Sequence, residues 1–267
     1  MIELNIQQSG FVKSKDISVP DNFYFRIASG IDDLDIALGG GFIAGQTFTL
    51  AGTPGSGKTT MLLQMLDGIQ KNGLNVGYIS AEETIYQLGF TSCRIGVEDV
   101  HIANMNVIEH IFDEVKKNKF DVIIIDSLPA IVSTTGLRRV FLETYLANYI
   151  TSTAKQLGVV VGVILHSTKR GTYKGTTLFP HNVDCNVMIR RNKYDSSICE
   201  FEVTKNRFGS TGTTYFSMTE NGFDFTAIDG DTIKEKSKDK EQNKEEDEEV
   251  VNFEYQVELP PKTIKNY

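Results

Sequence analysis

Short apolar runs alternate with longer amphipathic stretches over residues 27–229. The apolar runs predict strands that are buried on both faces, and the amphipathic stretches predict the helices that cover them. The predicted strands are Thr47–Ala51, Val76–Ser80, Asp121–Asp126, Val159–Leu165, Asn186–Arg190, Cys199–Thr204 and Thr214–Phe216, and the predicted helices are Lys58–Lys71, Val107–Lys117 and Leu142–Gln156. This alternation predicts an α/β core in which a mostly parallel, twisted sheet is flanked by helices.

The pattern changes at both ends of the chain. Residues 1–26 mix short apolar alternation with polar turns and are interpreted as an N-terminal arm. Residues 230–249 are highly charged and contain no aromatic side chain, so they predict a disordered acidic linker that cannot offset its ordering entropy by burial. Residues 250–267 begin with alternating apolar and polar side chains, the period of a half-buried strand. A terminal docking segment is therefore predicted, and its own domain, a neighbouring subunit or another protein stay open as its partner.

Composition and charge narrow the functional classes only in part. No stretch reaches the roughly 20 apolar residues that cross a bilayer, and MIELNIQQSG lacks a signal-peptide pattern, so a cytoplasmic protein with no membrane partner is expected. The three cysteines show no CxxC spacing, which argues against a disulfide framework and a zinc ribbon. The net charge is −8, and residues 231–267 contribute half of it with 11 acidic and 7 basic side chains. A DNA partner would therefore need local basic loops.

The strongest chemical signal is GTPGSGKT, a complete phosphate-binding loop of the form GxxxxGK[ST]. It follows an apolar strand and precedes an amphipathic helix, so its backbone N–H groups and the positive end of the helix dipole can face a phosphate chain. Lys58 is expected to bind the β- and γ-phosphates of ATP, and the Thr59 hydroxyl is expected to bind Mg²⁺. The predicted nucleotide-binding residues are Gly52, Thr53, Pro54, Gly55, Ser56, Gly57, Lys58, Thr59 and Thr60.

Two further carboxylates are expected beside this loop. Asp126 ends the buried run FDVIIID, at the carboxyl end of a strand, where an acid can hold the metal. Glu82 and Glu83 follow another buried strand, and one of them must orient the attacking water. Glu82 is predicted to serve as this base, whereas Glu83 is expected to be a plain surface acid.

The segment RIASGIDDLDIALGGGFIAGQ, at Arg26–Gln46, resembles the segment that precedes the phosphate loop in RadA/Sms and KaiC-like RecA-fold ATPases. The stretches YISAEET, DVIIIDSL and HSTKRG resemble the same family. KNRFG, at Lys205–Gly209, resembles a hallmark of RadA/Sms proteins, and the similarity covers residues 26–225 in family order. The resemblance implies a RecA-type P-loop NTPase core. Because residues 1–26 contain no cysteine and an acidic tail ends the chain, the zinc module and the Lon-like domain of that family are not expected.

The resemblance also implies roles for individual side chains. His166, at a strand end, would contact or sense the γ-phosphate region. Lys205 and Arg207 would reach across a subunit boundary or toward DNA, because RecA-type sites lie between protomers, and a hexameric ring or a filament is therefore implied. The residues that would carry catalysis are Glu82, Lys58, His166, Lys205 and Arg207, and those that would hold the metal are Thr59 and Asp126.

Two segments fit the position of single-stranded DNA-binding loops in such motors. The predicted contacts are Arg138, Arg139, Lys169, Arg170, Tyr173 and Lys174. The leading hypothesis is a DNA-stimulated ATPase that acts on single-stranded DNA in recombination and repair, by branch migration, strand exchange or helicase activity. A DnaB-like replicative helicase motor and a KaiC-like regulatory ATPase with a protein partner are the alternatives. A module that binds ATP without hydrolysing it is disfavoured by Glu82.

Overall fold

A computed structural model of the chain describes residues 11–167, 178–193, 195–226 and 228. The chain divides into two units, Met1–Ala227 and Ile228–Tyr267, and every element named below lies in the first. The predicted acidic linker (230–249) and docking segment (250–267) lie outside the described residues, as do the predicted DNA contacts Lys169, Arg170, Tyr173 and Lys174. The division into arm, core, linker and docking segment stays a prediction.

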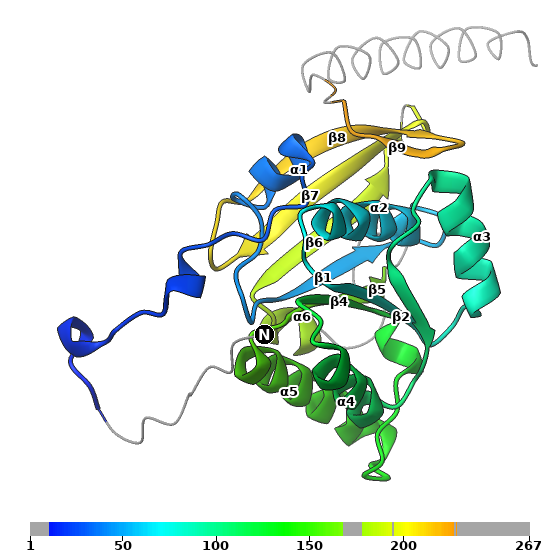
Figure 1. Cartoon of the computed structure of the whole chain (residues 1–267). Helices are drawn as coiled ribbons and strands as arrows, with labels where there is room; N and C mark the ends of the chain where they lie inside the picture. The colour runs from blue at the N-terminus through cyan, green and yellow to red at the C-terminus, as the bar shows by residue number, and fades with distance from the viewer. Residues whose placement is uncertain (1–10, 168–177, 194, 227, 229–267) are drawn as a thin grey trace, which may run out of the picture. The chain divides into compact units, whose positions relative to one another are not determined.

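The described residues form a nine-stranded sheet with the order β3-β2-β4-β5-β1-β6-β7-β8-β9 (Figure 1). Strands β3 to β6 in this order pair in parallel, and β6 to β9 pair antiparallel. The strands are β1 (Thr47–Gly52), β2 (Val76–Ser80), β3 (His101–Asn104), β4 (Val122–Asp126), β5 (Val160–His166), β6 (Cys185–Arg191), β7 (Ile198–Asn206), β8 (Gly212–Thr219) and β9 (Gly222–Asp224). The predicted mostly parallel α/β sheet is confirmed.

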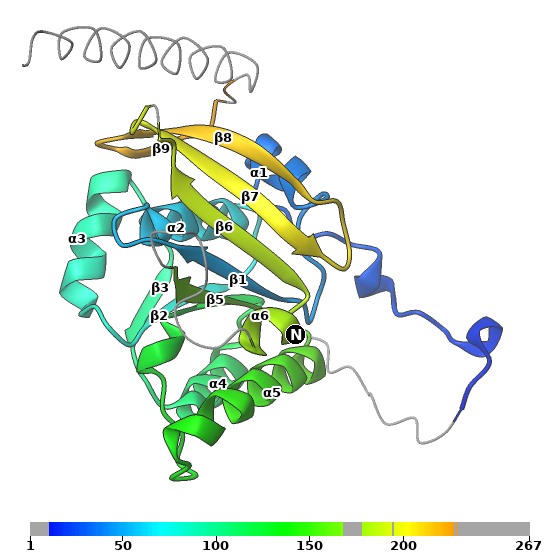
Figure 2. The same cartoon turned by 180° about the vertical axis from the view of Figure 1, so that it is seen from behind.

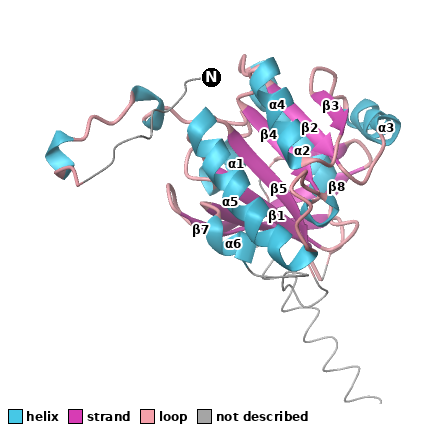
Figure 3. Ribbon diagram, turned by 90° about the horizontal axis from the view of Figure 1, so that it is seen from below, coloured by secondary structure: helices cyan, strands magenta, loops and turns pink. Residues whose placement is uncertain are grey.

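Helices cover both faces of the parallel part of the sheet (Figures 2 and 3). They are α1 (Asp32–Ala37), α2 (Lys58–Lys71), α3 (Ile85–Ile95), α4 (Ile108–Asn118), α5 (Arg139–Leu157) and α6 (Leu178–Asn182). Successive strand residues point to opposite faces, so β4 contributes Ile124 to the core beneath α2 and Ile123 to the core beneath α4 and α5. Two apolar clusters, one on each face, therefore hold the sheet in place.

The apolar runs predicted the central strands and α2 closely, whereas peripheral elements were missed. Strand β3 was missed because its residues are not fully buried and form no apolar run. Helix α5 begins at Arg139, three residues before the predicted start, since its first turn is exposed and does not follow the amphipathic period. None of the helices in the described ranges has the length and apolar character needed to span a membrane.

Candidate nucleotide-binding site

The parallel strands bring the predicted chemistry to one edge of the sheet. Gly52 at the end of β1 is in register with His166 at the end of β5, and Ser80 at the end of β2 is in register with Asp126 at the end of β4. The phosphate loop follows β1, and Glu82 follows β2. Carboxyl ends of parallel strands are where ligands bind in such sheets, so this edge is the candidate site.

The loop between β1 and α2 has the backbone of a phosphate cradle. Gly55 and Gly57 have φ values of 76° and 94°, which favour glycine, and Gly57 directly precedes the first residue of α2. A side chain at Gly52 would place its Cβ 2.5 Å from the Ser56 Oγ and 2.6 Å from the Ile189 carbonyl oxygen. The loop therefore needs glycine where the backbone is crowded and where it turns.

The Lys58 side chain lies folded over this loop. Its ammonium group donates to the carbonyl oxygens of Gly52 at 3.1 Å and Thr53 at 3.0 Å. Burial lowers the pKa of Lys58, while the nearby carboxylates of Asp126 and Glu82 raise it. The buried Ser56 Oγ has no hydrogen-bond partner among the described residues. A buried ammonium group beside this glycine-rich loop suits the phosphates of a nucleotide.

The two predicted metal ligands meet at a tyrosine. The Tyr78 hydroxyl donates to Asp126 Oδ2 at 2.6 Å, and the neighbouring Thr59 side chain lowers the pKa of Tyr78. Tyr78 is fully buried, and burial raises its pKa well above the ordinary value. Burial also raises the pKa of Asp126, against the hydrogen bond from Tyr78. Carboxylate and hydroxyl oxygens are the ligands that Mg²⁺ prefers, so this pair fits the predicted metal.

Glu82 lies beside Ser127 and His166. The Ser127 hydroxyl donates to Glu82 Oε1, and His166 Nε2 lies 3.4 Å from both Glu82 Oε1 and Ser127 Oγ. The other ring nitrogen of His166, Nδ1, is buried without a partner in the described part of the chain. The predicted base is therefore held by its neighbours, within reach of the loop that carries Lys58.

Glu83 differs from the sequence expectation. It is half-buried, and burial raises its pKa, with the charges of Asp126 and Glu82 acting in the same direction. The expectation of a plain surface acid is wrong, because Ser80 Oγ accepts hydrogen bonds from the N–H groups of both glutamates and folds the turn toward the site. The charges of Glu82 and Asp126 therefore both act on the Glu83 carboxyl group.

Lys205 and Arg207 lie near the amino end of β1, at the other end of the strand from the phosphate loop. Arg207 donates to Asp184 Oδ1 at 3.0 Å, and Lys205 donates to the carbonyl oxygens of His181 and Val183 at 2.8 and 2.6 Å. Asp184 also accepts from Thr47, the first residue of β1, whereas the phosphate loop follows the last residue. A strand of this length separates its ends by about 17 Å, so these cations do not meet the phosphate loop of their own chain.

The described DNA-contact candidates lie at the start of α5. Arg138 precedes the helix and Arg139 is its first residue, so Arg139 belongs to a helix and not to the predicted loop. Both are exposed, as is Phe141, whose exposed fraction is 62%. Glu109 holds the segment before α5 by accepting a hydrogen bond from the Thr134 N–H at 3.0 Å. It also accepts one from the hydroxyl of Tyr145, within α5, at 2.9 Å. Phe141, two positions after Arg139, was not among the predicted contacts.

Comparison with known proteins supports the same core. The family model described as "ATPase: KaiC" matches residues 27–99. The DNA repair protein RadA of Haemophilus influenzae is 31% identical over 205 residues, which cover 74% of this chain and 44% of that protein. RadA of Aquifex aeolicus is 32% identical over 209 residues, with 74% and 46% covered.

The chain carries a RadA-type, RecA-fold ATPase core.

Solved structures share the fold of this RadA-type core. The ATPase domain of G40P superposes with a TM-score of 0.68 at 15% identity, covering 76% of this chain and 92% of that one. A KaiC-like protein from Pyrococcus horikoshii gives a TM-score of 0.64 at 20% identity, covering 76% and 99%. The chain spans less than half the length of the RadA proteins compared above.

Removing the Tyr78 hydroxyl tests the metal assignment in the RadA-type core. Tyr78→Phe keeps the ring in the core but frees the Asp126 carboxylate, so the Mg²⁺ concentration that half-saturates nucleotide binding should rise about 10- to 100-fold. Binding of a fluorescent ADP analogue, titrated with Mg²⁺, measures this shift. Binding of the analogue without metal and the melting temperature serve as controls. An unchanged Mg²⁺ requirement would show that Tyr78 acts only as a core residue.

Proposed function

We propose that this chain is an ATP- and Mg²⁺-dependent, DNA-stimulated ATPase that acts on single-stranded DNA in recombination or repair, by branch migration, strand exchange or helicase activity. One observation carries the proposal. The carboxyl ends of the parallel strands bring together the phosphate loop, the Tyr78–Asp126 pair and Glu82, and the segment that follows β4 leads to the exposed arginines before and at the start of α5. One segment of the chain therefore links a site for ATP to a surface that suits a polyanion.

The side chains at this edge divide the work of hydrolysis. Lys58 would exchange the carbonyl oxygens of Gly52 and Thr53 for phosphate oxygens. Glu82 would accept the proton of the attacking water once its contact with Ser127 opens. Mg²⁺ held by Thr59 and Asp126 would neutralise charge on the phosphates. His166, 3.4 Å from Glu82, would sense the γ-phosphate region and couple it to the base.

The proposal includes self-association as a hexameric ring or a filament. Arg207 is 49% exposed at its side chain and lies at the sheet edge opposite the phosphate loop. It can therefore complete only the site of a neighbouring copy, where a cation supplied in trans stabilises the transition state. Head-to-tail contact of this kind closes into a ring or continues as a filament.

Contact with single-stranded DNA is proposed at the start of α5. Arg138 and Arg139 offer charge for phosphates, and the exposed Phe141 ring offers a face on which a base can stack. The predicted contacts Lys169, Arg170, Tyr173 and Lys174 extend the same proposal. The comparison with proteins named for DNA repair supports it.

ATP turnover with and without single-stranded DNA tests this function. Stimulation of several-fold is expected, falling steeply with salt because phosphate contacts dominate. Lys58→Ala measures contaminating activity, and Arg138→Ala should reduce the stimulation. Turnover that DNA does not change would favour a KaiC-like regulatory ATPase with a protein partner, in line with the family match over residues 27–99. Unwinding of duplex DNA without any effect on strand exchange would favour a DnaB-like replicative motor.

A further inference from the structure

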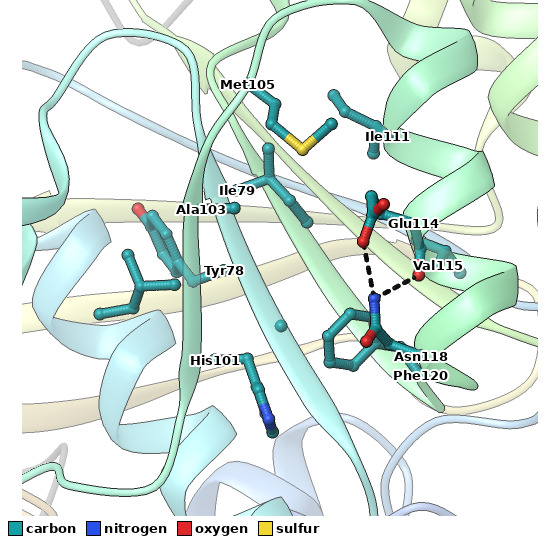
Figure 4. Close-up of a pocket in the computed structure, with 12 residues that line it drawn as sticks. Tyr78, Ile79, His101, Ala103, Met105, Ile111, Glu114, Val115, Asn118 and Phe120 are labelled. Atoms are coloured by element: carbon teal, nitrogen blue, oxygen red, sulfur yellow. Dashed lines mark hydrogen bonds between the residues drawn. The ribbon is translucent and has the colours of Figure 1, made fainter.

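Charged side chains also pair outside the candidate nucleotide-binding site, and the pairs differ in what they leave free. One carboxylate, Glu114, lies at the rim of a mainly apolar cavity of about 250 Å³ between α4, β2 and β3 (Figure 4). It is already paired with Lys117 and hydrogen-bonded to Asn118. The pair of Arg207 and Asp184 is different, because the arginine side chain stays 49% exposed and donates, among the described residues, to Asp184 alone. This arginine therefore keeps donors for a further partner.

Asp184 is a buried carboxylate held between β1 and the turn after β7. Its side chain is only 2% exposed. One oxygen, Oδ2, accepts from the N–H and the hydroxyl of Thr47, at 3.0 Å each, where β1 begins. The other, Oδ1, accepts from Arg207 Nη1 at 3.0 Å, and the Arg207 N–H donates to the Asp184 carbonyl oxygen at 2.9 Å. A charge at this depth needs such partners, so they fix the place of the carboxylate.

The turn that carries Arg207 is also fixed from the side of α1. Asn206, the residue before the arginine, donates to the carbonyl oxygen of Leu38 at 3.0 Å, where α1 ends. Gly209 packs so closely there that a side chain on Gly39 would place its Cβ 2.8 Å from Gly209 Cα. The backbone on both sides of Arg207 is therefore held, and the freedom that remains lies in the arginine side chain itself.

The contact with Asp184 restricts this remaining freedom. A long, half-exposed arginine side chain samples many rotamers, and ordering it at the moment of reaction costs free energy. A fixed carboxylate on one nitrogen of the Arg207 guanidinium orders the side chain in advance. The other N–H groups of the planar fork can then meet a phosphate. Such ordering before the reaction is what lets a charged group lower a barrier.

We propose that Asp184 is a positioning residue that holds Arg207 ready for the nucleotide site of a neighbouring copy. The inference rests on the proposed function, in which Arg207 acts in trans. Asp184 meets β1 at Thr47, and the phosphate loop of the same chain follows the other end of that strand. The carboxylate therefore serves the site that its chain completes in a neighbour and not the site that its own chain contains.

Mixtures of two inactive variants test this direction of action. In the reference mixture, Lys58→Ala chains supply Arg207, and Arg207→Ala chains hold the intact nucleotide site. Asp184→Asn in the supplying chain should lower the recovered ATP hydrolysis by at least about tenfold, because a small misplacement of a catalytic group can cost about 100-fold. The same substitution in the receiving Arg207→Ala chain should leave the recovered rate nearly unchanged. A merely structural role would lower the rate in both mixtures.

Glu202→Gln in the supplying chain is the matched control. It removes the carboxylate of another arginine pair, in which Arg190 of β6 donates to Glu202 of β7 at 2.5 Å. This pair lies on the strands before the turn and makes no contact with Arg207 or Asp184 among the described residues. The recovered rate should therefore stay at the level of the reference mixture.

Cleavage by trypsin at the Arg207–Phe208 bond gives a measurement that needs neither nucleotide nor a second copy. Trypsin takes the arginine side chain into its own specificity pocket, so the side chain must first leave Asp184. Asp184→Asn should therefore speed cleavage after Arg207 several-fold relative to cleavage after Arg191, at the end of β6. Mass spectrometry of the early fragments separates the two sites.

The outcomes distinguish this inference from the function on which it rests. Recovery in the reference mixture, with an equal loss or no loss in the two Asp184→Asn mixtures, would overturn the role of Asp184 and leave the shared site intact. Unchanged trypsin cleavage after Arg207 would also overturn it. No recovery in the reference mixture would instead refute the shared site, and the role of Asp184 with it.

Discussion

Glu82→Gln should slow ATP hydrolysis by about 10²- to 10⁴-fold while ATP binding is kept, because glutamine preserves the shape of the side chain but cannot take a proton. The Glu82 carboxylate is the acid that Ser127 and His166 hold at the sheet edge. Single-turnover hydrolysis measures the chemical step, and equilibrium binding of labelled ATP measures the ground state.

Glu83→Gln is the matched control for this experiment. Glu83 lies one residue away and also feels the charge of Asp126, but its half-buried carboxyl has a raised pKa and is therefore more readily protonated. We expect a much smaller loss of rate from this variant. A larger loss from Glu83→Gln than from Glu82→Gln would exchange the two roles.

Arg207→Ala should lower ATP hydrolysis by about 10³- to 10⁵-fold, the range seen when a cation supplied in trans is removed from a phosphoryl-transfer site. The decisive measurement is the ATP hydrolysis of a mixture of two inactive variants. Arg207→Ala subunits retain Lys58, and Lys58→Ala subunits retain Arg207, so a mixed assembly contains some complete sites although each variant alone is inactive. Recovery of steady-state hydrolysis on mixing measures the shared site.

Stability must be separated from catalysis in this variant. Asp184 is almost fully buried and pairs with Arg207, so loss of the arginine leaves a buried carboxylate with one partner fewer. Arg207→Lys keeps the positive charge beside Asp184 but lacks the planar fork of arginine. A normal melting temperature with low activity in Arg207→Lys would support the transfer role. Full activity of the Arg207→Ala variant, or no recovery on mixing, would contradict it.

The central part of the fold was predictable because strands buried on both faces leave continuous apolar runs. Helix α2 was predicted with its observed bounds, Lys58–Lys71, since its apolar period and the phosphate loop before it agree. Strand β3 was not predictable in the same way. Its residues are only partly buried at the edge of the sheet, so pairing with β2 specifies the strand more than its own composition does.

In the candidate site, too, residues in a local motif were predictable and those that depend on tertiary contacts were not. A motif of fixed spacing pointed to Lys58 and Thr59. Tyr78 was missed because a tyrosine inside VGYIS reads as one more core side chain, and its link to Asp126 exists only across neighbouring strands. The exposure of Glu83 depended on how Ser80 folds the turn after β2, which the order of residues alone does not reveal.

The segment that follows β4 connects the candidate nucleotide-binding site with the exposed start of α5. Asp126 ends the strand, and the Ser127 hydroxyl donates to Glu82. The same segment is then hydrogen-bonded to Glu109 and ends at the arginines before and at the start of α5. Arg138 lies eleven residues after Ser127, so a pull on the arginines would reach the serine that restrains the predicted base through this one segment. Under the proposed function, single-stranded DNA bound at these arginines would release the Glu82 carboxylate through this segment.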